Sequence, residues 1–243
     1  MRNKKINFLS QVIKANQKIY KILQKGMKKS YFKKFEVGAG GDVSSKIDLI
    51  AEEIFIKYLA SFGRINSEES GIIGEGKDEI IIDPIDGSTN CLSLFPYFGS
   101  SVALRQDGKI TVGVIANFAN GDIFIKDKNQ FKVAKLHNLK FKDVKKTKND
   151  KIVGIFEKGY KENHQGDLLR KNDIKYRVPG AIALSLAYGH YVDFLLFANL
   201  SRDYDIMAGL YMCEDLHIST INGYTLICKD KKRHKFLKEV LKG

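Results

Sequence analysis

The stretch Ile80-Ile-Ile-Asp-Pro-Ile-Asp-Gly-Ser-Thr-Asn90 combines a short apolar run with two carboxylates and a glycine. Three isoleucines favour a buried β-strand, and Pro84 has no N–H to donate, so regular pairing is expected to end there. Asp83 and Asp86 follow three residues apart across a turn, so both side chains can face one point. Gly87-Ser88-Thr89 then stands where a helix could begin with free N–H groups. Hard anions beside amide donors suit a divalent cation and a phosphate held together.

The composition around this stretch is that of a globular protein. The chain has 243 residues, 44% of them hydrophobic and only 3 of them proline, which is enough for one large domain or two lobes that share a core. No apolar run approaches the roughly 20 residues of a membrane-spanning helix, and the start of the sequence lacks the apolar core of a secretory signal. We therefore expect a cytoplasmic protein.

Cysteine and histidine give no sign of a metal site. The three cysteines are odd in number and widely spaced, which is typical of reduced, structural residues. The five histidines never fall at the intervals of a zinc site. Any metal ion in this protein must therefore be held by oxygen.

The net charge of +13 has two competing explanations. It can attract anionic substrates, or it can form a surface for nucleic acid or acidic lipid. The lysines are spread from Lys4 to Lys242, which favours a solvated basic surface. Aromatic residues are not interleaved with them in a base-stacking pattern, so specific nucleic-acid binding is not expected.

The first part of the chain predicts two helices around a glycine-rich loop. Apolar residues at helical spacing predict a helix from Ile6 to Met27. The segment Phe35 to Asp42 has three glycines in four residues, which predicts a mobile loop, either a hinge over a site or, as we favour, a plain connection. Ser44 or Ser45 then caps a second helix that runs to about Phe62, with Asp48 near its start.

Glu68 and Glu69 follow a short apolar stretch, and only one of the two can face a given site, because neighbours in an extended chain point in opposite directions. From Phe98 the apolar residues alternate with period two, interrupted by turn signals at Asp107-Gly108 and Asn120-Gly121. This pattern predicts an antiparallel meander directly after the acidic loop.

The polar, basic segment from Lys135 to Lys151 predicts a boundary between two lobes. The first, residues 1–145, is an α+β lobe with the antiparallel sheet and the acidic loop. The second, residues 146–243, alternates strands and helices, which favours a layered α/β lobe that completes the site. Asp205 opens one of its helices, and by itself such an aspartate is usually an N-cap.

These acidic motifs together resemble the signature of the inositol monophosphatase family, whose members are magnesium-dependent, lithium-sensitive phosphatases. The resemblance rests on Glu68-Glu69-Ser70, on Asp83-Pro84-Ile85-Asp86-Gly87-Ser88-Thr89-Asn90, and on Asp205 followed by Ala208-Gly209. It extends from Asp48 to about Gly223. It implies an α/β fold, a layered α/β/α/β/α sandwich of the sugar-phosphatase type.

The resemblance also implies a set of metal ligands made only of oxygen. Glu68, Asp83 and the carbonyl of Ile85 would hold one Mg²⁺, and Asp83, Asp86 and Asp205 would hold a second, so that Asp83 bridges the two. A third, weaker ion would contact Glu68. Mg²⁺ prefers such ligands and shares phosphate oxygens with its substrate.

Catalytic and phosphate-binding roles follow from the same resemblance. The Ser88 hydroxyl, with Asp48 behind it, would orient or deprotonate the attacking water, and Glu68 would contribute through the ion that it binds. Family members often have threonine where Ser88 stands, and both residues carry the hydroxyl. The backbone N–H groups of Gly87, Ser88 and Thr89 would hold the phosphate.

The substrate pocket differs from that of the better-known members. The Gly180-Ala181 turn matches the backbone that lines the sugar pocket, and Tyr204 stands where tryptophan is common. Inositol-hydrolysing members place a glutamate where this chain has Ala198. Arg202 is positioned either to bind a second phosphate or another anionic group, or to be a surface residue.

The resulting hypothesis is a Mg²⁺-dependent phosphomonoesterase that acts on a small phosphorylated sugar, polyol or related metabolite. Fructose-1,6-bisphosphatase and 3′-phosphoadenosine 5′-phosphate phosphatase are alternatives within the same class. A basic module that binds nucleic acid or protein is the non-enzymatic alternative. Family members are often dimers, so a homodimer is possible, and a membrane association is not expected.

Overall fold

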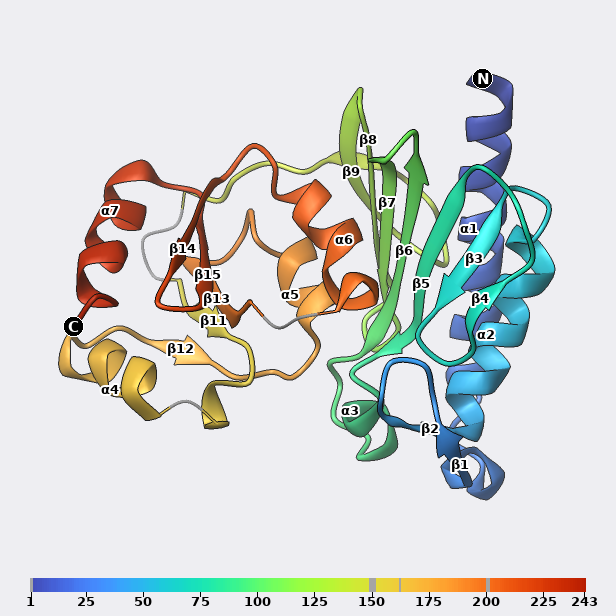
Figure 1. The fold of residues 1–243 in the computed structure, drawn as a ribbon, viewed down its shortest axis with the longest axis horizontal. Helices are drawn as coiled ribbons and strands as arrows, with labels where there is room; N and C mark the ends of the chain where they lie inside the picture. Colours follow the sequence, from blue (N-terminus) through green and yellow to red (C-terminus); the bar gives the residue numbers. More distant parts are fainter. Residues whose placement is uncertain (1, 149–151, 162, 200–201) are drawn as a thin grey trace.

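The computed structural model describes residues 2–148, 152–161, 163–199 and 202–243, which form two large β-sheets separated and flanked by helices, together with a small two-stranded sheet (Figure 1). The layers, from one side of the molecule to the other, are helices α4 (Asn163–Lys171) and α7 (Lys231–Val240), a five-stranded sheet, helices α5 (Ile182–Ala187) and α6 (Asp203–Met212), an eight-stranded sheet, and helices α1 (Arg2–Leu23) and α2 (Lys46–Leu59). The predicted α/β/α/β/α sandwich is therefore confirmed.

The eight-stranded sheet has the strand order β10-β9-β8-β7-β6-β5-β3-β4. Its strands are β3 (Arg64–Ser67), β4 (Gly71–Ile73), β5 (Glu79–Asp86), β6 (Gly99–Gln106), β7 (Lys109–Asn117), β8 (Asp122–Asp127), β9 (Gln130–Lys135) and β10 (Lys142–Asp143). Strands β6 to β9 are the predicted antiparallel meander. The turn between β6 and β7 places Asp107 and Gly108 at φ values of 48° and 77°, as a type I′ hairpin turn requires.

Helices α1 and α2 cover the outer face of this sheet and share one apolar core with it (Figure 1). Phe8, Val12 and Ile19 of α1 are fully buried in that core. The helix was expected to reach Met27, but it ends at Leu23. Gly26 then adopts φ +88°, a left-handed conformation in which the helix cannot continue.

The five-stranded sheet has the order β12-β11-β13-β15-β14. Its strands are β11 (Gly154–Phe156), β12 (Tyr176–Arg177), β13 (Phe194–Ala198), β14 (His217–Ile221) and β15 (Tyr224–Cys228). Helices α5 and α6 fill the space between the two sheets, and α4 and α7 cover the outer face (Figure 1). Sequence analysis did not predict β14, whose half-exposed residues lack a clear apolar alternation.

Two local predictions were wrong in detail. The segment around the glycine loop is not a plain connection, because β1 (Lys34–Val37) and β2 (Val43–Ser45) pair as a small hairpin around it, just after the 3₁₀ helix η1 (Lys29–Phe32). Strand β5 does not end at Pro84 but continues to Asp86, with an irregularity in its pairing with β6 between Asp83 and Asp86. Proline at a bulge of this kind removes no ladder hydrogen bond.

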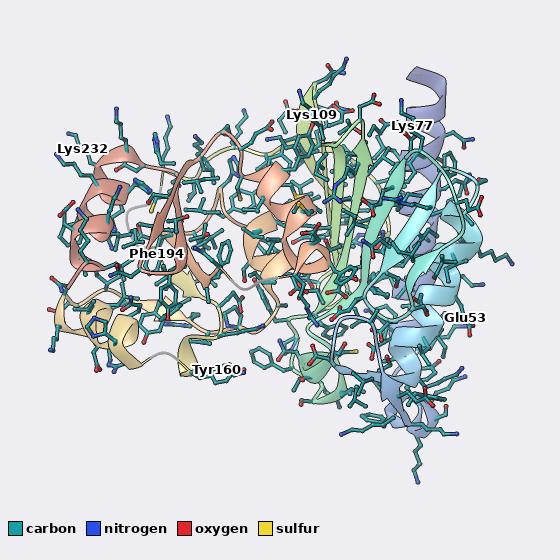
Figure 2. All side chains as sticks on the ribbon, in the orientation of Figure 1. Glu53, Lys77, Lys109, Tyr160, Phe194 and Lys232 are labelled. Atoms are coloured by element: carbon teal, nitrogen blue, oxygen red, sulfur yellow. The ribbon has the colours of Figure 1, made fainter. Side chains whose placement is uncertain are left out.

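Burial separates the apolar interior from a charged exterior. Phe194 lies within the C-terminal sheet layer, whereas Lys77, Lys109 and Lys232 project from the periphery (Figure 2). The three cysteines are buried and free, in agreement with the sequence prediction. In the part of the chain that the structure describes, none of the helices has the length and apolarity to cross a membrane.

Candidate active site

The site is built around the carboxyl end of β5, a strand that is buried along its whole length. Asp83 and Asp86 lie on either side of the pairing irregularity, and their side chains are almost completely buried. The Oδ1 atom of Asp83 has no hydrogen-bond partner. Burial and the neighbouring carboxylates raise the pKa of both aspartates well above the usual range. The strand thus ends in negative charge that the protein itself leaves uncompensated.

Two further carboxylates approach this strand end from other elements. Glu68 follows β3, and its backbone N–H donates to the Ile82 carbonyl of β5 at 3.1 Å. Asp205 lies in the first turn of α6, whose N-cap is Arg202, so Asp205 is not the N-cap that its position suggested. One carboxylate oxygen from each of Glu68, Asp83 and Asp205 lies within 4.8 Å of the other two. Three of the four predicted carboxylate ligands therefore meet in space, and Asp86 is not part of this group.

Asp48 and Ser88 form a hydrogen-bonded pair beside the acidic cluster. Asp48 is buried at the start of α2, where its Oδ2 accepts the Ser45 N–H at 2.7 Å in a capping box. The Ser88 hydroxyl lies 2.8 Å from Asp48 Oδ1 and 2.9 Å from the Ile85 carbonyl oxygen. Desolvation raises the pKa of Asp48. Asp48 therefore both caps the helix and serves as an acceptor for the Ser88 hydroxyl.

The phosphate-binding prediction falls on a tight turn. Gly87 is the N-cap of the short helix α3 (Ser88–Leu92) and adopts φ +83°. A side chain there would be strained, and its Cβ would lie 3.0 Å from the Ala181 Cβ and 3.1 Å from the Tyr97 carbonyl oxygen. Because the first amides of a helix have no intrahelical partner, the N–H groups from Gly87 to Thr89 form one edge of the site.

Arg202 lies within the acidic cluster. Its guanidinium forms ion pairs with Glu68 at 2.6 Å, with Asp205 at 3.2 Å and with Asp42 at 2.9 Å. It also donates to the Gly40 carbonyl, so it ties the glycine loop to the cluster. Arg202 therefore lies beside the predicted metal ligands, with its donors engaged by groups of the protein.

Glu69 faces different partners from Glu68, as predicted, but both residues lie in the turn that follows β3 and not in an extended chain. It accepts a hydrogen bond from the Ser44 hydroxyl, whereas Glu68 faces the cluster. Desolvation by burial, together with the nearby carboxylates Asp48, Glu68 and Glu52, raises the pKa of Glu69 to about 7.

The predicted substrate turn at Gly180-Ala181 lies beside Gly87, since a Cβ at Gly87 would be 3.0 Å from the Ala181 Cβ and 3.3 Å from the Gly180 carbonyl oxygen. Sequence analysis missed two residues that hold this turn. Asn90 Nδ2 donates to the Pro179 carbonyl at 2.7 Å, and Glu157 accepts the Gly180 N–H at 3.1 Å. Asn90 belongs to the central motif and could have been found there, whereas nothing in the sequence around Glu157 marks it.

The donor set fits a divalent cation. All the candidate side-chain ligands are carboxylates, one of them has an oxygen without a partner, and three of them converge on a small volume. Oxygen ligands of this type suit hard cations such as Mg²⁺ or Ca²⁺, not zinc or copper. A divalent ion would compensate the buried charge that Arg202 compensates only in part.

Comparisons with known proteins relate this chain to one family of phosphatases. The family model described as "Inositol monophosphatase family" matches residues 7–216. A fructose-1,6-bisphosphatase/inositol-1-monophosphatase of Methanothermobacter thermautotrophicus is 30% identical over 202 residues, which cover 74% of this chain and 71% of that protein. A bifunctional NADP phosphatase/NAD kinase of Methanocaldococcus jannaschii is 27% identical over 74% of this chain, but the match spans only 38% of its own length.

The fold is also found among solved structures. The crystal structure of the extragenic suppressor protein suhB from Bartonella henselae superimposes with a TM-score of 0.79, at 24% sequence identity, over 96% of this chain and 98% of that one. The family model and the relatives thus indicate one family, and the solved structure shows the same fold. The chain belongs to the inositol monophosphatase family and is a hydrolase of phosphoric monoesters that depends on a divalent metal ion.

Proposed function

We propose that this protein uses Mg²⁺ to hydrolyse the phosphate monoester of a small sugar, polyol or related metabolite. The observation that carries the proposal is the convergence of Glu68, Asp83 and Asp205 beside the Ser88 hydroxyl and the Gly87 turn. Carboxylates from three separate elements are brought to one point that also borders unpaired helix amides. Such an arrangement is suited to phosphoryl transfer to water.

In this proposal Glu68, Asp83 and the Ile85 carbonyl hold one Mg²⁺, and Asp83, Asp86 and Asp205 hold a second. The ions, when bound, neutralise the phosphate and lower the pKa of water. The Leu184 N–H donates to Asp86 Oδ2 at 3.1 Å, which fixes the orientation of that carboxylate.

Ser88 and Asp48 are proposed to orient the attacking water and to accept its proton. Asp48 Oδ1 accepts a hydrogen bond from the Ser88 hydroxyl at 2.8 Å, so the hydroxyl oxygen can in turn accept a hydrogen bond from water and orient it. The amides of Gly87, Ser88 and Thr89 are proposed to bind the phosphate oxygens. Gly87 adopts φ +83°, and a Cβ at this position would lie 3.0 Å from the Ala181 Cβ, so this phosphate edge requires glycine.

The alcohol part of the substrate is proposed to lie against the Gly180-Ala181 turn. Sugar bisphosphates and nucleotide phosphates are alternatives, in line with the fructose-1,6-bisphosphatase and NADP phosphatase named among the relatives. Ala198 at the end of β13 offers no side-chain acceptor for a ring hydroxyl. Arg202, if it exchanged its present carboxylate partners for an anion, would favour a substrate with a second negative group.

The experiment that tests the proposal is a phosphate-release assay over several substrates. The substrates are inositol 1-phosphate, fructose 1,6-bisphosphate, histidinol phosphate, 3′-phosphoadenosine 5′-phosphate and NADP, each with Mg²⁺, with EDTA and with Mg²⁺ plus Li⁺. We expect release of phosphate from at least one substrate with Mg²⁺, none with EDTA, and inhibition by Li⁺. Release that persists in EDTA would contradict the proposed metal chemistry.

The net charge of +13 gives the non-enzymatic alternative its one supporting observation. If the basic surface serves nucleic acid, the Asp83→Asn variant should bind RNA or DNA tightly, with a steep dependence on salt. Weak binding at about 150 mM salt would exclude a nucleic-acid-binding role. The positive charge would then serve to attract anionic substrates.

A cytoplasmic location and a homodimer complete the proposal. Sedimentation equilibrium of the purified protein tests the dimer, because a monomer at micromolar concentration would exclude it.

A further inference from the structure

One buried carboxylate lies near the site but is not among the proposed metal ligands. Glu157 directly follows β11, and its side chain is 4% exposed. Its own N–H donates to the Leu196 carbonyl of β13 at 2.9 Å, so the backbone continues the parallel pairing of β11 with β13. A glutamate on this sheet is expensive to bury, and desolvation raises its pKa. The burial of the Glu157 carboxylate therefore has to be offset by hydrogen bonds.

The carboxylate of Glu157 accepts hydrogen bonds from the substrate turn and from the helix that follows it. Oε2 accepts the Gly180 N–H at 3.1 Å, and the Ala181 N–H also hydrogen-bonds the carboxyl group. Oε1 accepts a short hydrogen bond from the Ser185 hydroxyl, which in turn lies 3.0 Å from the Tyr97 hydroxyl. Both N–H groups of the turn are therefore directed at one carboxylate.

The same turn is held from the opposite side by α3. Asn90 Nδ2 lies 2.7 Å from the Pro179 carbonyl oxygen and 2.8 Å from the Tyr97 carbonyl oxygen. Glu157 comes from the five-stranded sheet, and Asn90 comes from the helix that follows the metal-binding strand. The turn is thus fixed to both halves of the molecule. Its N–H groups are held by Glu157 of the five-stranded sheet, and its carbonyl is held by Asn90 of α3.

This turn is also a wall of the site. The Ala181 Cβ and the Gly180 carbonyl are within 3.3 Å of where a Gly87 side chain would begin. The helix after the turn, α5, donates the Leu184 N–H to Asp86. A displacement of the turn would therefore change the distance between the phosphate edge and whatever part of the substrate lies against Ala181.

We propose that Glu157 is a positioning residue that fixes the Pro179–Ala181 turn against the phosphate edge and so sets the fit of the alcohol part of the substrate. The side chain is too buried to touch the substrate itself, and its oxygens are already engaged. The inference rests on the proposed function, because it assigns the turn to the substrate pocket of that reaction.

The test compares three variants of the full-length protein. Glu157→Leu leaves the turn amides without an acceptor. Glu157→Gln keeps one carbonyl oxygen for them and offers its NH₂ to Ser185, whose hydroxyl can accept. Asp193→Asn is the matched control, because Asp193 is a partly buried carboxylate next to β13 that pairs with Arg233 at 2.7 Å and, among the described residues, forms no hydrogen bond with the turn.

With the best substrate of the assay above, Glu157→Leu is expected to raise KM about tenfold while kcat stays within about threefold. The inhibition constant of inorganic phosphate should stay within about twofold, because the phosphate edge is formed by β5 and α3. Glu157→Gln should restore KM to near the wild-type value, and Asp193→Asn should leave KM unchanged. An unchanged KM in Glu157→Leu, or equal losses in KM and phosphate binding, would overturn the proposal.

Amide hydrogen exchange of the turn provides a readout that needs no activity. The Gly180 and Ala181 amides should exchange at least about tenfold faster in Glu157→Leu than in wild type, and those of Asp193→Asn should not change. If wild-type protein hydrolyses none of the substrates but the turn loses protection, the proposed function fails and Glu157 still holds the turn. If protection is unchanged, the positioning role fails, whatever the activity. Should Glu157→Leu not fold, Ser185→Ala must show a smaller rise in KM in the same direction, and no rise would overturn the role.

Discussion

The two ends of β5 carry buried carboxylates in opposite electrostatic settings. At the start of the strand, Glu79 is paired with Arg105 at 2.7 Å and with Arg64 at 3.4 Å. At its end, Asp83 and Asp86 face other carboxylates, and the pKa of each is raised well above its usual range. One strand therefore holds both a compensated acid and a pair of uncompensated ones.

The difference shows where stability has been given up for function. A buried acid with cationic partners raises the free energy of unfolding or leaves it unchanged. A buried acid among other acids lowers it. Arg202 is the cation that the structure places against the cluster, and it contacts Glu68 and Asp205. We therefore expect substitutions at Asp83, at the end of β5, to change activity, and substitutions at Glu79, at its start, to change stability.

The largest effect is expected from Asp83→Asn. If Asp83 holds both of the proposed ions, removal of its carboxylate should lower kcat/KM by roughly a thousandfold or more. Phosphate release with saturating Mg²⁺ measures this. The variant should be folded, since the substitution removes buried charge, and activity close to wild type would exclude Asp83 as a metal ligand.

Ser88 is expected to come next. Ser88→Ala removes the hydroxyl that lies 2.8 Å from Asp48 and should lower kcat about a hundredfold with little change in KM. Ser88→Thr keeps the hydroxyl and should retain most of the activity. Equal activity of the alanine and threonine variants would show that the hydroxyl has no part in the reaction.

Glu79→Gln tests the start of β5, where the buried carboxylate is paired with arginines. Loss of the carboxylate leaves Arg105 with one anionic partner, Asp203, and should lower the free energy of unfolding by about 1–3 kcal/mol. Denaturant unfolding measures this cost. The Mg²⁺ dependence of the activity should be unchanged, and a large loss of kcat with normal stability would remove the contrast between the two ends.

The smallest effect is expected at Arg202. Its guanidinium contacts Glu68 and Asp205, so Arg202→Ala should strengthen Mg²⁺ binding by a few-fold, with Arg202→Lys in between. Calorimetric titration of the metal-free protein measures the affinity. Weaker Mg²⁺ binding in the alanine variant would show that Arg202 supports the metal site.

The antiparallel meander could be predicted from the sequence, because it depends on local signals: period-two alternation and turn residues, of which Asp107-Gly108 adopts the type I′ conformation. The five layers and the full set of metal ligands were predicted from the resemblance of the acidic motifs to a known family, and not from local patterns. The paired strand containing Asp83 could be predicted as buried but not as continuous past Pro84, because a bulge depends on the partner strand.

The rest of the site depends on contacts between distant segments. Arg202 reaches Asp42 over 160 residues of sequence, and Glu157 reaches Gly180 from a different strand. Neither contact leaves a periodic or compositional trace. The hairpin of β1 and β2 was missed for a related reason. All four residues of β1 are exposed, so the strand shows no apolar alternation, and the glycines that follow it predict a loop.

The most direct test of the central claim is thermal unfolding of wild type and Asp83→Asn at about pH 5 and pH 7.5, each with and without Mg²⁺. In the metal-free protein, carboxyl groups with a raised folded-state pKa give stability that is present below their unfolded pKa near 4 and is lost as pH rises through the folded value. The pKa of His190 and of His234 is lowered by burial, so these residues have the opposite effect, but they are common to both proteins.

We predict that metal-free wild type loses more stability than Asp83→Asn between the two pH values, and that Mg²⁺ raises the Tm of wild type at pH 7.5 but leaves that of the variant unchanged. Each kcal/mol corresponds to about 2–4 °C in a chain of this length. Equal Mg²⁺ shifts in both proteins, or no shift in wild type, would contradict the assignment of the end of β5 as a metal site.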